Sequence, residues 1–146
     1  RNFGTKLWNA TRFAQLNVAV FGQDIEADTL QQPINRWIVS GVLQCAETVS
    51  VAIEDYRFND AADAVYRFVW DVVCDWYVEL SKPLLQGEDV AARDETREVL
   101  GWTLEQIYKI MHPFSPFITE TLWQQTSARN SFVMLEAWPG AKAPLW

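Results

Sequence analysis

Apolar side chains recur at three- and four-residue steps through most of this chain, and this period constrains the fold more than any other feature. From Ile34 the apolar series continues for about six helical turns. Its members are Ile34, Ile38, Cys45, Val49, Ala52 and Tyr56. Such spacing places all of them on one face of a helix.

A second strong series predicts a helix that Asn59 or Asp60 caps and that Pro83 ends after Lys82. Its apolar stripe is Ala62, Val65, Val69, Val72, Trp76 and Leu80, widened by Phe68, Val73 and Tyr77. Because the stripe is so wide, we expect this helix to be the most buried of all.

Two further helices are predicted after a turn around Gly87. One spans Arg93 to Met111, with Leu100, Leu104, Ile107 and Met111 facing inward. The other begins at Pro116 after a possible Ser115 cap and runs to about Gln125. Its inward residues are expected to be Phe117, Ile118, Leu122 and Trp123.

Together with a helix at the start of the chain, this makes an all-α fold, a mostly antiparallel bundle of about five helices. A loop from Val20 to Pro33 joins the first two helices. Gly41 interrupts the second helix at a cost of about 1 kcal/mol relative to alanine, which is tolerable if a neighbouring helix needs a close approach there. We assign residues 1–130 to the bundle and 131–146 to a short extended tail. The tail is expected to lie along the bundle or to lead to a missing part of a longer protein.

Composition excludes several classes of protein. With 49% apolar residues the chain is expected to be globular. We expect neither a signal peptide nor a membrane span, since no apolar run has the length that either needs. Cys45 and Cys74 lie on apolar helix faces, which predicts buried free thiols, no disulfide and a cytoplasmic protein. Since the chain starts without Met inside an apparent helix, we expect a fragment.

The first thirteen residues, RNFGTKLWNATRF, carry two different faces. Phe3, Leu7, Ala10 and Ala14 form a core stripe, whereas Asn2, Lys6, Asn9 and Phe13 fall in another arc, flanked by Arg12. Amide, cation and aromatic ring together suit nucleic-acid bases and phosphates. The alternative is that Phe13 covers a neighbouring helix and the polar residues are only solvated.

Charge singles out the same segment. The first 23 residues contain Arg1, Lys6 and Arg12 but no acid, although the whole chain has a net charge of -7. An acidic protein with one basic element would bind a nucleic acid along that element only.

Motifs for catalysis are absent. The sequence has no glycine-rich phosphate loop, GxSxG elbow or HExxH pair, and no clustered spacing of metal ligands. His112, beside Pro113, is expected to complement helix-end carbonyls. Asp71, Asp75 and Glu79 stand four residues apart and could serve an acid or a metal, but a solvated acidic face is the simpler interpretation.

Five segments give the chain a family resemblance: RNFGTKLWNATRF, NRW at 35–37, FNDAADAVYRFVWDVVCDWYVELSK at 58–82, HPFSPFITETLWQ at 112–124 and EAWP at 136–139. In this order they resemble the anticodon-binding helical domain of the bacterial valyl-tRNA synthetases, which are class I aminoacyl-tRNA synthetases. Asn35 departs from the family pattern, where Asp usually precedes Arg-Trp, and Gly4 departs from it within the first helix.

The resemblance implies that the domain grips the anticodon stem-loop of tRNA(Val), whose middle and third anticodon bases are adenine and cytosine. By motif it implies that Lys6, Arg12 and Phe13 reach the anticodon, with Phe13 stacking on a base. Asn9 is added from its position on the helical wheel, and Arg1 is a candidate phosphate contact. The parent enzyme would attach valine to tRNA with ATP and magnesium, whereas this chain holds no catalytic residue, cofactor or metal.

Three alternatives remain open at this point. The chain could be a helical protein-interaction domain that docks on the catalytic half of a synthetase, a role that eight tryptophans favour. It could be the equivalent domain of an isoleucyl or leucyl enzyme. A free-standing helical enzyme that uses Asp71, Asp75 and Glu79 is the third.

Overall fold

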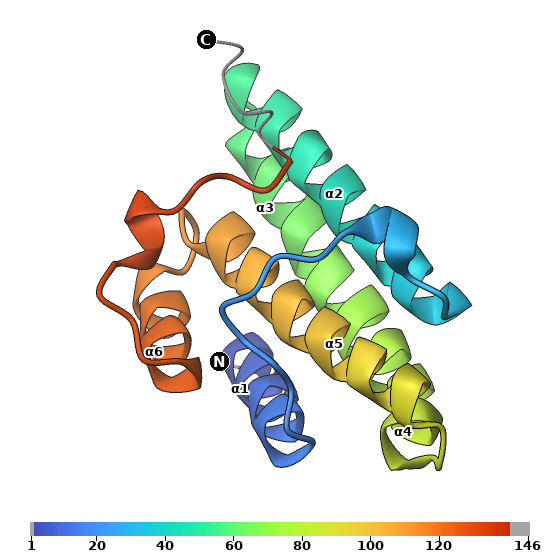
Figure 1. Cartoon of the computed structure of the whole chain (residues 1–146). Helices are drawn as coiled ribbons and strands as arrows, with labels where there is room; N and C mark the ends of the chain where they lie inside the picture. The colour runs from blue at the N-terminus through green and yellow to red at the C-terminus, as the bar shows by residue number, and fades with distance from the viewer. Residues whose placement is uncertain (1, 141–146) are drawn as a thin grey trace, which may run out of the picture.

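The chain folds as five helical rods with no strand between residues 2 and 140, which are the residues that this computed structural model describes (Figure 1). The all-α prediction is therefore confirmed. Four rods are single α-helices: α1 (Asn2–Leu16), α2 (Pro33–Glu54), α5 (Val90–Met111) and α6 (Pro116–Thr126). The fifth, between α2 and α5, is a long rod of three consecutive segments: α3 (Phe58–Arg67), the π-helix η2 (Phe68–Tyr77) and α4 (Val78–Gln86). Two short 3₁₀ turns, η1 (Ala27–Thr29) and η3 (Val133–Leu135), lie outside them.

Helix α5 is the centre of the bundle. It contacts α1, α2, α3, α4 and α6, and most of its residues from Val99 to Met111 are buried. Its N-terminus is capped by Asp89, whose carboxylate accepts the Ala92 N–H at 3.1 Å. This helix starts three residues earlier than the expected Arg93 because that cap lies upstream of the apolar series.

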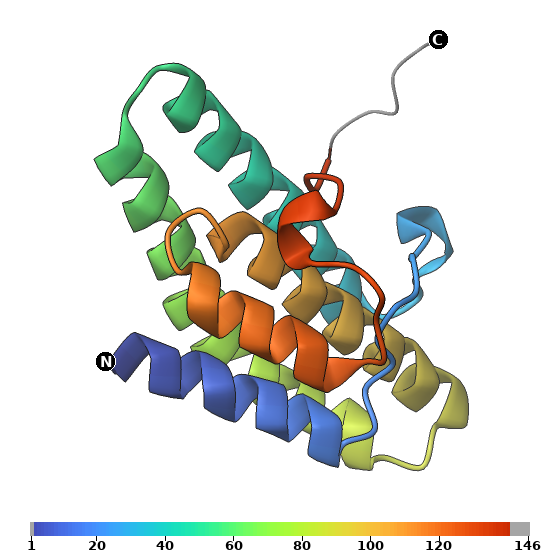
Figure 2. The ribbon, with the colours of Figure 1, turned by 90° about the vertical axis from the view of Figure 1, so that its left-hand side faces the viewer.

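The helices do not all run antiparallel to their neighbours. Helix α1 is antiparallel to α5, since Thr11 contacts Tyr108 at 2.7 Å and Arg97 donates to the Asn17 carbonyl. It runs parallel to α6, which it meets closely where Gly4 faces Ile118. Figure 2 shows α1 and α6 side by side on the outside of the bundle.

The predicted loop after α1 crosses α5 and is fixed to it. The Val20 N–H donates to the Arg97 carbonyl at 3.0 Å, and the Gly22 N–H donates to the Glu105 carboxylate at 2.7 Å. A Cβ on Gly101 would lie 1.8 Å from the Val20 carbonyl oxygen, so only glycine permits this crossing. Glu105 is buried and is paired with Arg129.

A buried polar network joins the start of α2 to α5 and the long rod. Asn35 is fully buried, accepts the Tyr77 hydroxyl at 2.9 Å and donates to Glu95 and Thr96, each at 3.1 Å. An aspartate at position 35 could not make the two donations and would face the Glu95 carboxylate. The departure from the family pattern therefore has a structural reason in this chain.

The long rod buries a residue at every fourth position. This series is Ala61, Val65, Val69, Val73, Tyr77, Ser81 and Leu85, and Val78, next to Tyr77, is the one further buried residue of the rod. In an α-helix a four-residue step overshoots a full turn by about 40°, so the stripe would leave the core. The i to i+5 hydrogen bonds of η2 give wider turns and keep the stripe facing inward.

The π-helix makes part of the predicted stripe wrong. Trp76 and Leu80 were expected inside but are 61% and 43% exposed, because the wider turns rotate them toward α2 and solvent. The caps were also wrong: the rod begins at Phe58, and it continues through Pro83 to Gln86. Leu85 is buried and holds the last turn in place although Pro83 lacks a donor.

The structure also decides the surroundings of Gly41 and the buried face of α6. The close approach at Gly41 is confirmed, since a Cβ there would lie 3.0 Å from the Phe68 ring. The inward position of Phe117 is wrong: this ring is 88% exposed, because Thr119, Leu122 and Trp123 form the buried face of α6. Ser115 precedes α6 as expected, but its side chain does not cap the helix.

Residues 131–140 lie back along the bundle, in line with one of the two expectations for the tail. The Val133 N–H donates to Glu120 at 3.0 Å, and the Trp138 ring packs against the core. The predicted tail also includes 141–146, which lie outside the described residues.

Helix α2 meets the length and composition of a membrane span, contrary to the expectation from the sequence. Its inward face, which includes Ile38, Val42 and Val49, is fully buried in the bundle. Core helices of soluble proteins pass the same test, so this helix is weak evidence for a membrane protein.

Cys45 and Cys74 are free thiols, as predicted. Burial raises the pKa of Cys45 to about 12 and that of Cys74 to about 11, so both remain protonated and unreactive at neutral pH.

Candidate nucleic-acid interface

Helix α1 presents one face to solvent. Leu7, Ala10, Thr11 and Ala14 are buried against the bundle, as the sequence predicted for three of these four. Asn9 and Arg12 are exposed on the opposite side. Since α1 contains no acid, this exposed face combines an amide and a cation without a carboxylate on the same helix.

Lys6 does not project freely into solvent. Its ammonium nitrogen lies 2.5 Å from the Asp75 carboxylate and 3.9 Å from the centre of the Trp70 ring. The lysine side chain is 25% exposed and the aspartate side chain 50% exposed. The structure therefore holds Lys6 at the edge between α1 and η2, where an incoming phosphate would compete with Asp75.

Phe13 is half-buried and packs against the core cluster. The Lys82 ammonium nitrogen lies 5.8 Å from its ring centre, at the edge of α4. The structure thus combines the two interpretations that the sequence left open: Phe13 covers a neighbouring rod, but part of the ring remains accessible.

The four described candidates for RNA contact therefore lie in two parts of the α1 surface. Asn9 and Arg12 share the outward face of α1, whereas Lys6 and Phe13 line its boundary with the long rod. Arg1, the fifth candidate, lies outside the described residues.

Trp8 was missed by the sequence reasoning. It is 40% exposed and is the most accessible aromatic ring on α1. Its angular position on the helical wheel lies outside the core stripe of Leu7, Ala10 and Ala14, which was the available signal. An exposed indole next to the polar arc adds a second ring to this surface.

Carboxylates border α1 on the side of the long rod. Asp71, Asp75 and Glu79 are all exposed, and two of them pair with cations, Asp75 with Lys6 and Glu79 with Lys82 at 2.7 Å. Among residues 2–140 no group of three His, Cys, Asp or Glu side chains is placed to hold a metal ion. The acidic row thus acts as a set of counter-charges, as a solvated face does.

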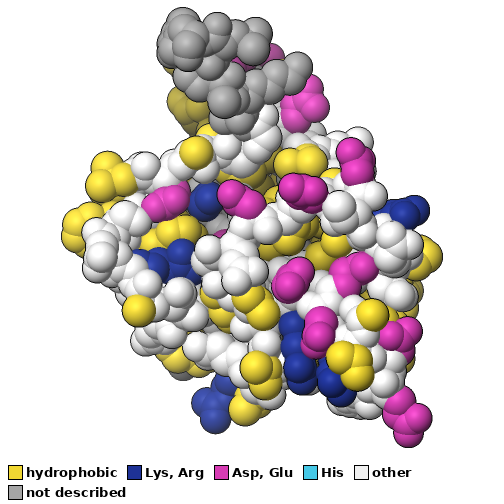
Figure 3. Space-filling model, in the orientation of Figure 1, with side chains coloured by type: hydrophobic (Ala, Val, Ile, Leu, Met, Phe, Trp, Pro, Cys, Tyr) yellow, Lys and Arg dark blue, Asp and Glu magenta, His cyan; other side chains and the backbone are white. Residues whose placement is uncertain are grey.

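The face of the molecule drawn in Figure 3, in the orientation of Figure 1, has no continuous basic surface among its described residues. Figure 3 shows Lys and Arg side chains there as small separate groups among carboxylates. A nucleic acid that needs phosphate neutralisation would find no continuous basic surface on this face.

His112 has a structural partner. Its Nδ1 lies 2.8 Å from the Thr119 hydroxyl, which also bonds the Ser115 carbonyl. The histidine therefore stabilises the turn between α5 and α6.

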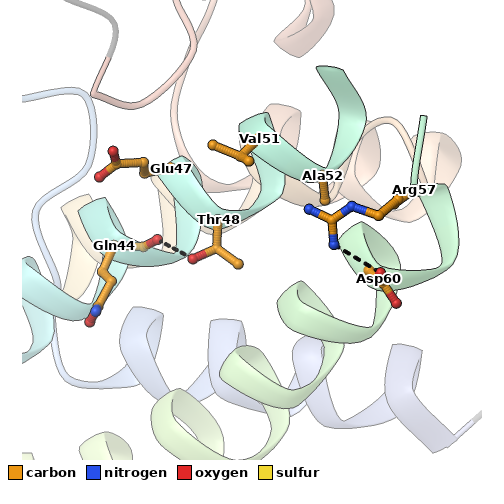
Figure 4. Close-up of a pocket in the computed structure, with 7 residues that line it drawn as sticks. All are labelled: Gln44, Glu47, Thr48, Val51, Ala52, Arg57 and Asp60. Atoms are coloured by element: carbon orange, nitrogen blue, oxygen red, sulfur yellow. Dashed lines mark hydrogen bonds and ion pairs between the residues drawn. The ribbon is translucent and has the colours of Figure 1, made fainter. Parts of the chain in front are cut away.

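A polar pocket of about 360 Å³ lies where α2 turns into α3 (Figure 4). Its one cation, Arg57, bonds Asp60 at 3.0 Å and Asp55 at 3.3 Å. These hydrogen bonds raise the pKa of Arg57 and keep it protonated, and the two carboxylates offset its positive charge. The pocket thus has no spare cation with which to hold an anionic ligand.

Comparison with known proteins adds evidence of ancestry. A family model described as the anticodon-binding domain of tRNA ligase matches residues 35–146, a range that begins in α2 and leaves out α1. The chain is also similar to valine-tRNA ligases. Identity is 52% over 139 residues with that of Bradyrhizobium diazoefficiens, 51% over 138 with that of Rhodopseudomonas palustris and 50% over 143 with that of Caulobacter vibrioides.

These similarities cover nearly the whole chain but a small part of each relative. They include 95%, 94% and 95% of this chain, respectively, and only 14%, 14% and 16% of the three relatives. The chain therefore corresponds in length to one domain of proteins that are several times longer.

Proposed function

Because the chain belongs to the family of anticodon-binding domains of tRNA ligases, we propose that it is the part of a valine-tRNA ligase that binds the anticodon stem-loop of tRNA(Val). The valyl branch is favoured over the isoleucyl and leucyl ones by relatives that are valine-tRNA ligases at about half identity. The observation that carries the choice of surface is the exposed, acid-free face of α1.

Each candidate residue on this face or at its boundary has a role that its chemistry permits. Arg12 and Asn9 carry donors, and Asn9 also an acceptor, that can read the edges of unstacked bases. Phe13 offers the accessible part of its ring for stacking, which is tolerant of base identity. Specificity for the adenine and cytosine of the anticodon then depends on the polar groups.

Lys6 is assigned to the RNA backbone. An ammonium group is a point charge suited to phosphate, and the cation-π contact with Trp70 keeps it at the edge of α1. Binding requires Lys6 to exchange the Asp75 carboxylate for a phosphate. Arg1 is assigned to a further phosphate by its sequence position alone.

The chemistry of the ligase is assigned to the rest of the polypeptide. There, the parent enzyme would attach valine to tRNA with ATP and magnesium in the cytoplasm, and this domain would hold the far end of the tRNA while docked on the catalytic domain. The chain's own contribution is recognition, since its one histidine and two of the three carboxylates in the acidic row, Asp75 and Glu79, have structural partners.

A direct test measures binding of a fluorescent anticodon stem-loop to the isolated chain. We expect binding that weakens as salt rises and that weakens again when the middle anticodon base is changed. Phe13→Leu keeps the apolar contact with the core but removes the ring, and should weaken binding about 5- to 100-fold. Arg12→Gln should weaken binding and reduce discrimination at the middle or third base.

Arg67→Gln is the matched control for Arg12→Gln. Arg67 is an exposed arginine on the long rod, paired with Asp63 at 3.0 Å, and its loss should leave binding nearly unchanged. Circular dichroism must show equal helicity in all variants. If Phe13→Leu binds as tightly as the unmodified chain, the ring belongs to the core alone and the site is wrongly assigned.

A further inference from the structure

An apolar groove lies between α2 and the second half of the long rod. Its volume is about 650 Å³, and it is lined by Pro33, Ile34, Trp37, Val72, Trp76 and Leu80. Every one of these side chains is apolar. Trp37, Trp76 and Leu80 are 44%, 61% and 43% exposed, so the groove opens directly to solvent.

The apolar surface continues along α2. A second hollow of about 310 Å³ shares Trp37 and Val72 with the groove and extends to Phe68, opposite Gly41. The two hollows therefore form one surface along the seam between α2 and the long rod.

The π-helix creates this surface. It keeps Val69, Val73 and Tyr77 in the core and leaves Val72, Trp76 and Leu80 on the neighbouring face. Two large indoles on one contiguous apolar surface are unusual in a protein with no partner, and such surfaces mark places where another protein segment packs.

The charges around the groove exclude RNA as the occupant. No Lys or Arg lines it, and the exposed carboxylates of Asp75 and Glu79 precede Trp76 and Leu80 in sequence. A polyanion would lose its counterions without finding replacement cations here. The groove is thus distinct in chemistry from the outward face of α1.

A second copy of the chain is also a poor occupant. A two-fold dimer would place the same patch against itself. Two concave surfaces that face each other would leave the space between them unfilled. The relatives supply a better candidate, because this chain accounts for only 14% to 16% of their length.

We infer that the groove between α2 and the η2–α4 rod holds an apolar segment of the longer polypeptide, from outside these 146 residues. This inference rests on the proposed function, since it requires the chain to be a domain of a tRNA ligase. The occupant is an aliphatic or aromatic stretch that covers both indoles.

Photo-crosslinking in the full-length ligase tests the inference. Benzoylphenylalanine replaces Trp76, and mass spectrometry identifies the adduct after irradiation with and without tRNA(Val). We expect an adduct to a protein segment outside residues 1–146 that forms equally with and without tRNA. The control places the same group at Tyr56, which is 82% exposed at the turn between α2 and α3, and should not give that adduct.

Four results would overturn the inference: an adduct to tRNA, an adduct to a second copy, an adduct within residues 1–146, or no adduct. Binding of the anticodon stem-loop to the Trp76→Ser chain is measured separately and should stay within twofold of the unmodified chain. If the stem-loop does not bind at all but the expected adduct forms, the proposed function fails and the docking surface stands.

Discussion

The ammonium group of Lys6 lies 2.5 Å from the carboxylate of Asp75, and so the cation of α1 nearest to the long rod is neutralised within the protein. The centre of the Trp70 ring lies 3.9 Å from the same ammonium group. The fold thus orients Lys6, which we propose binds an RNA phosphate, but it also pairs this lysine with Asp75. We therefore expect Asp75 to have a measurable effect on the proposed RNA binding.

Asp75→Asn should strengthen binding of the anticodon stem-loop. Removing the carboxylate frees Lys6 and lowers the repulsion of phosphate, and the loss of a half-exposed ion pair corresponds to a change of about two- to fivefold. Fluorescence anisotropy at several salt concentrations measures the effect. Asp63→Asn, which removes the partner of Arg67, is the control; an equal gain there would mean that net charge alone is responsible.

The acid sensitivity of the fold should depend on Glu95. Partial burial by itself would raise the pKa of this carboxyl, but hydrogen bonds from the backbone of Gln31 and Gln32 and from Asn35 hold it below its ordinary value of 4.5. The stabilisation is therefore complete above about pH 4.5 and is lost as the pH falls below it. Glu95→Gln should flatten the decline of Tm in this acid range.

Glu98→Gln is the matched control for the pH experiment. Glu98 is an exposed carboxylate on the same helix, and its removal should leave the decline of Tm with falling pH in place. An identical decline in the Glu95→Gln chain would show that the hydrogen bonds to the Glu95 carboxylate contribute nothing to the acid sensitivity.

Gly101→Ala should destabilise the protein although alanine is the better helix former. The gain in helix propensity is about 1 kcal/mol, but the new Cβ would lie 1.8 Å from the Val20 carbonyl oxygen. The loop must move away and lose its hydrogen bonds to α5, so we expect a net loss of about 1–3 kcal/mol. Urea unfolding measures it, with Glu98→Ala as the control on an exposed position of α5.

The register of the long rod can be tested by a pair of truncations. Val73 is fully buried and Val73→Ala should cost about 2 kcal/mol of unfolding free energy. Trp76→Ala removes a far larger side chain but should cost under about 1 kcal/mol, because Trp76 is 61% exposed. The opposite order would indicate a regular α-helix through residues 68–77.

The sequence predicted much of this fold because most of its signals are local. Apolar periodicity placed α2, α5 and α6 within a few residues of their observed ends, and the condition under which Gly41 is tolerable, a close approach by a neighbouring helix, is met. The core face of α1 was also correct, since Leu7, Ala10 and Ala14 are buried.

Errors arose where the helix departs from the regular α period. The wheel for the long rod used 100° per residue, and η2 turns less per residue over ten positions. Trp76 and Leu80 therefore moved from the expected core to the exposed groove. No local pattern in Phe68–Tyr77 distinguishes the two periods.

The sequence by itself determined the helical class, the acid-free first helix and the family. These depend on residue order, which needs no knowledge of what lies across the bundle. Only the tertiary structure decided that Lys6 is paired with Asp75, that Phe13 is half-buried and that Val20 crosses Gly101. The first and the last of these contacts join residues that are 69 and 81 positions apart in the chain. Packing across the bundle, which helical periodicity does not encode, brings them together.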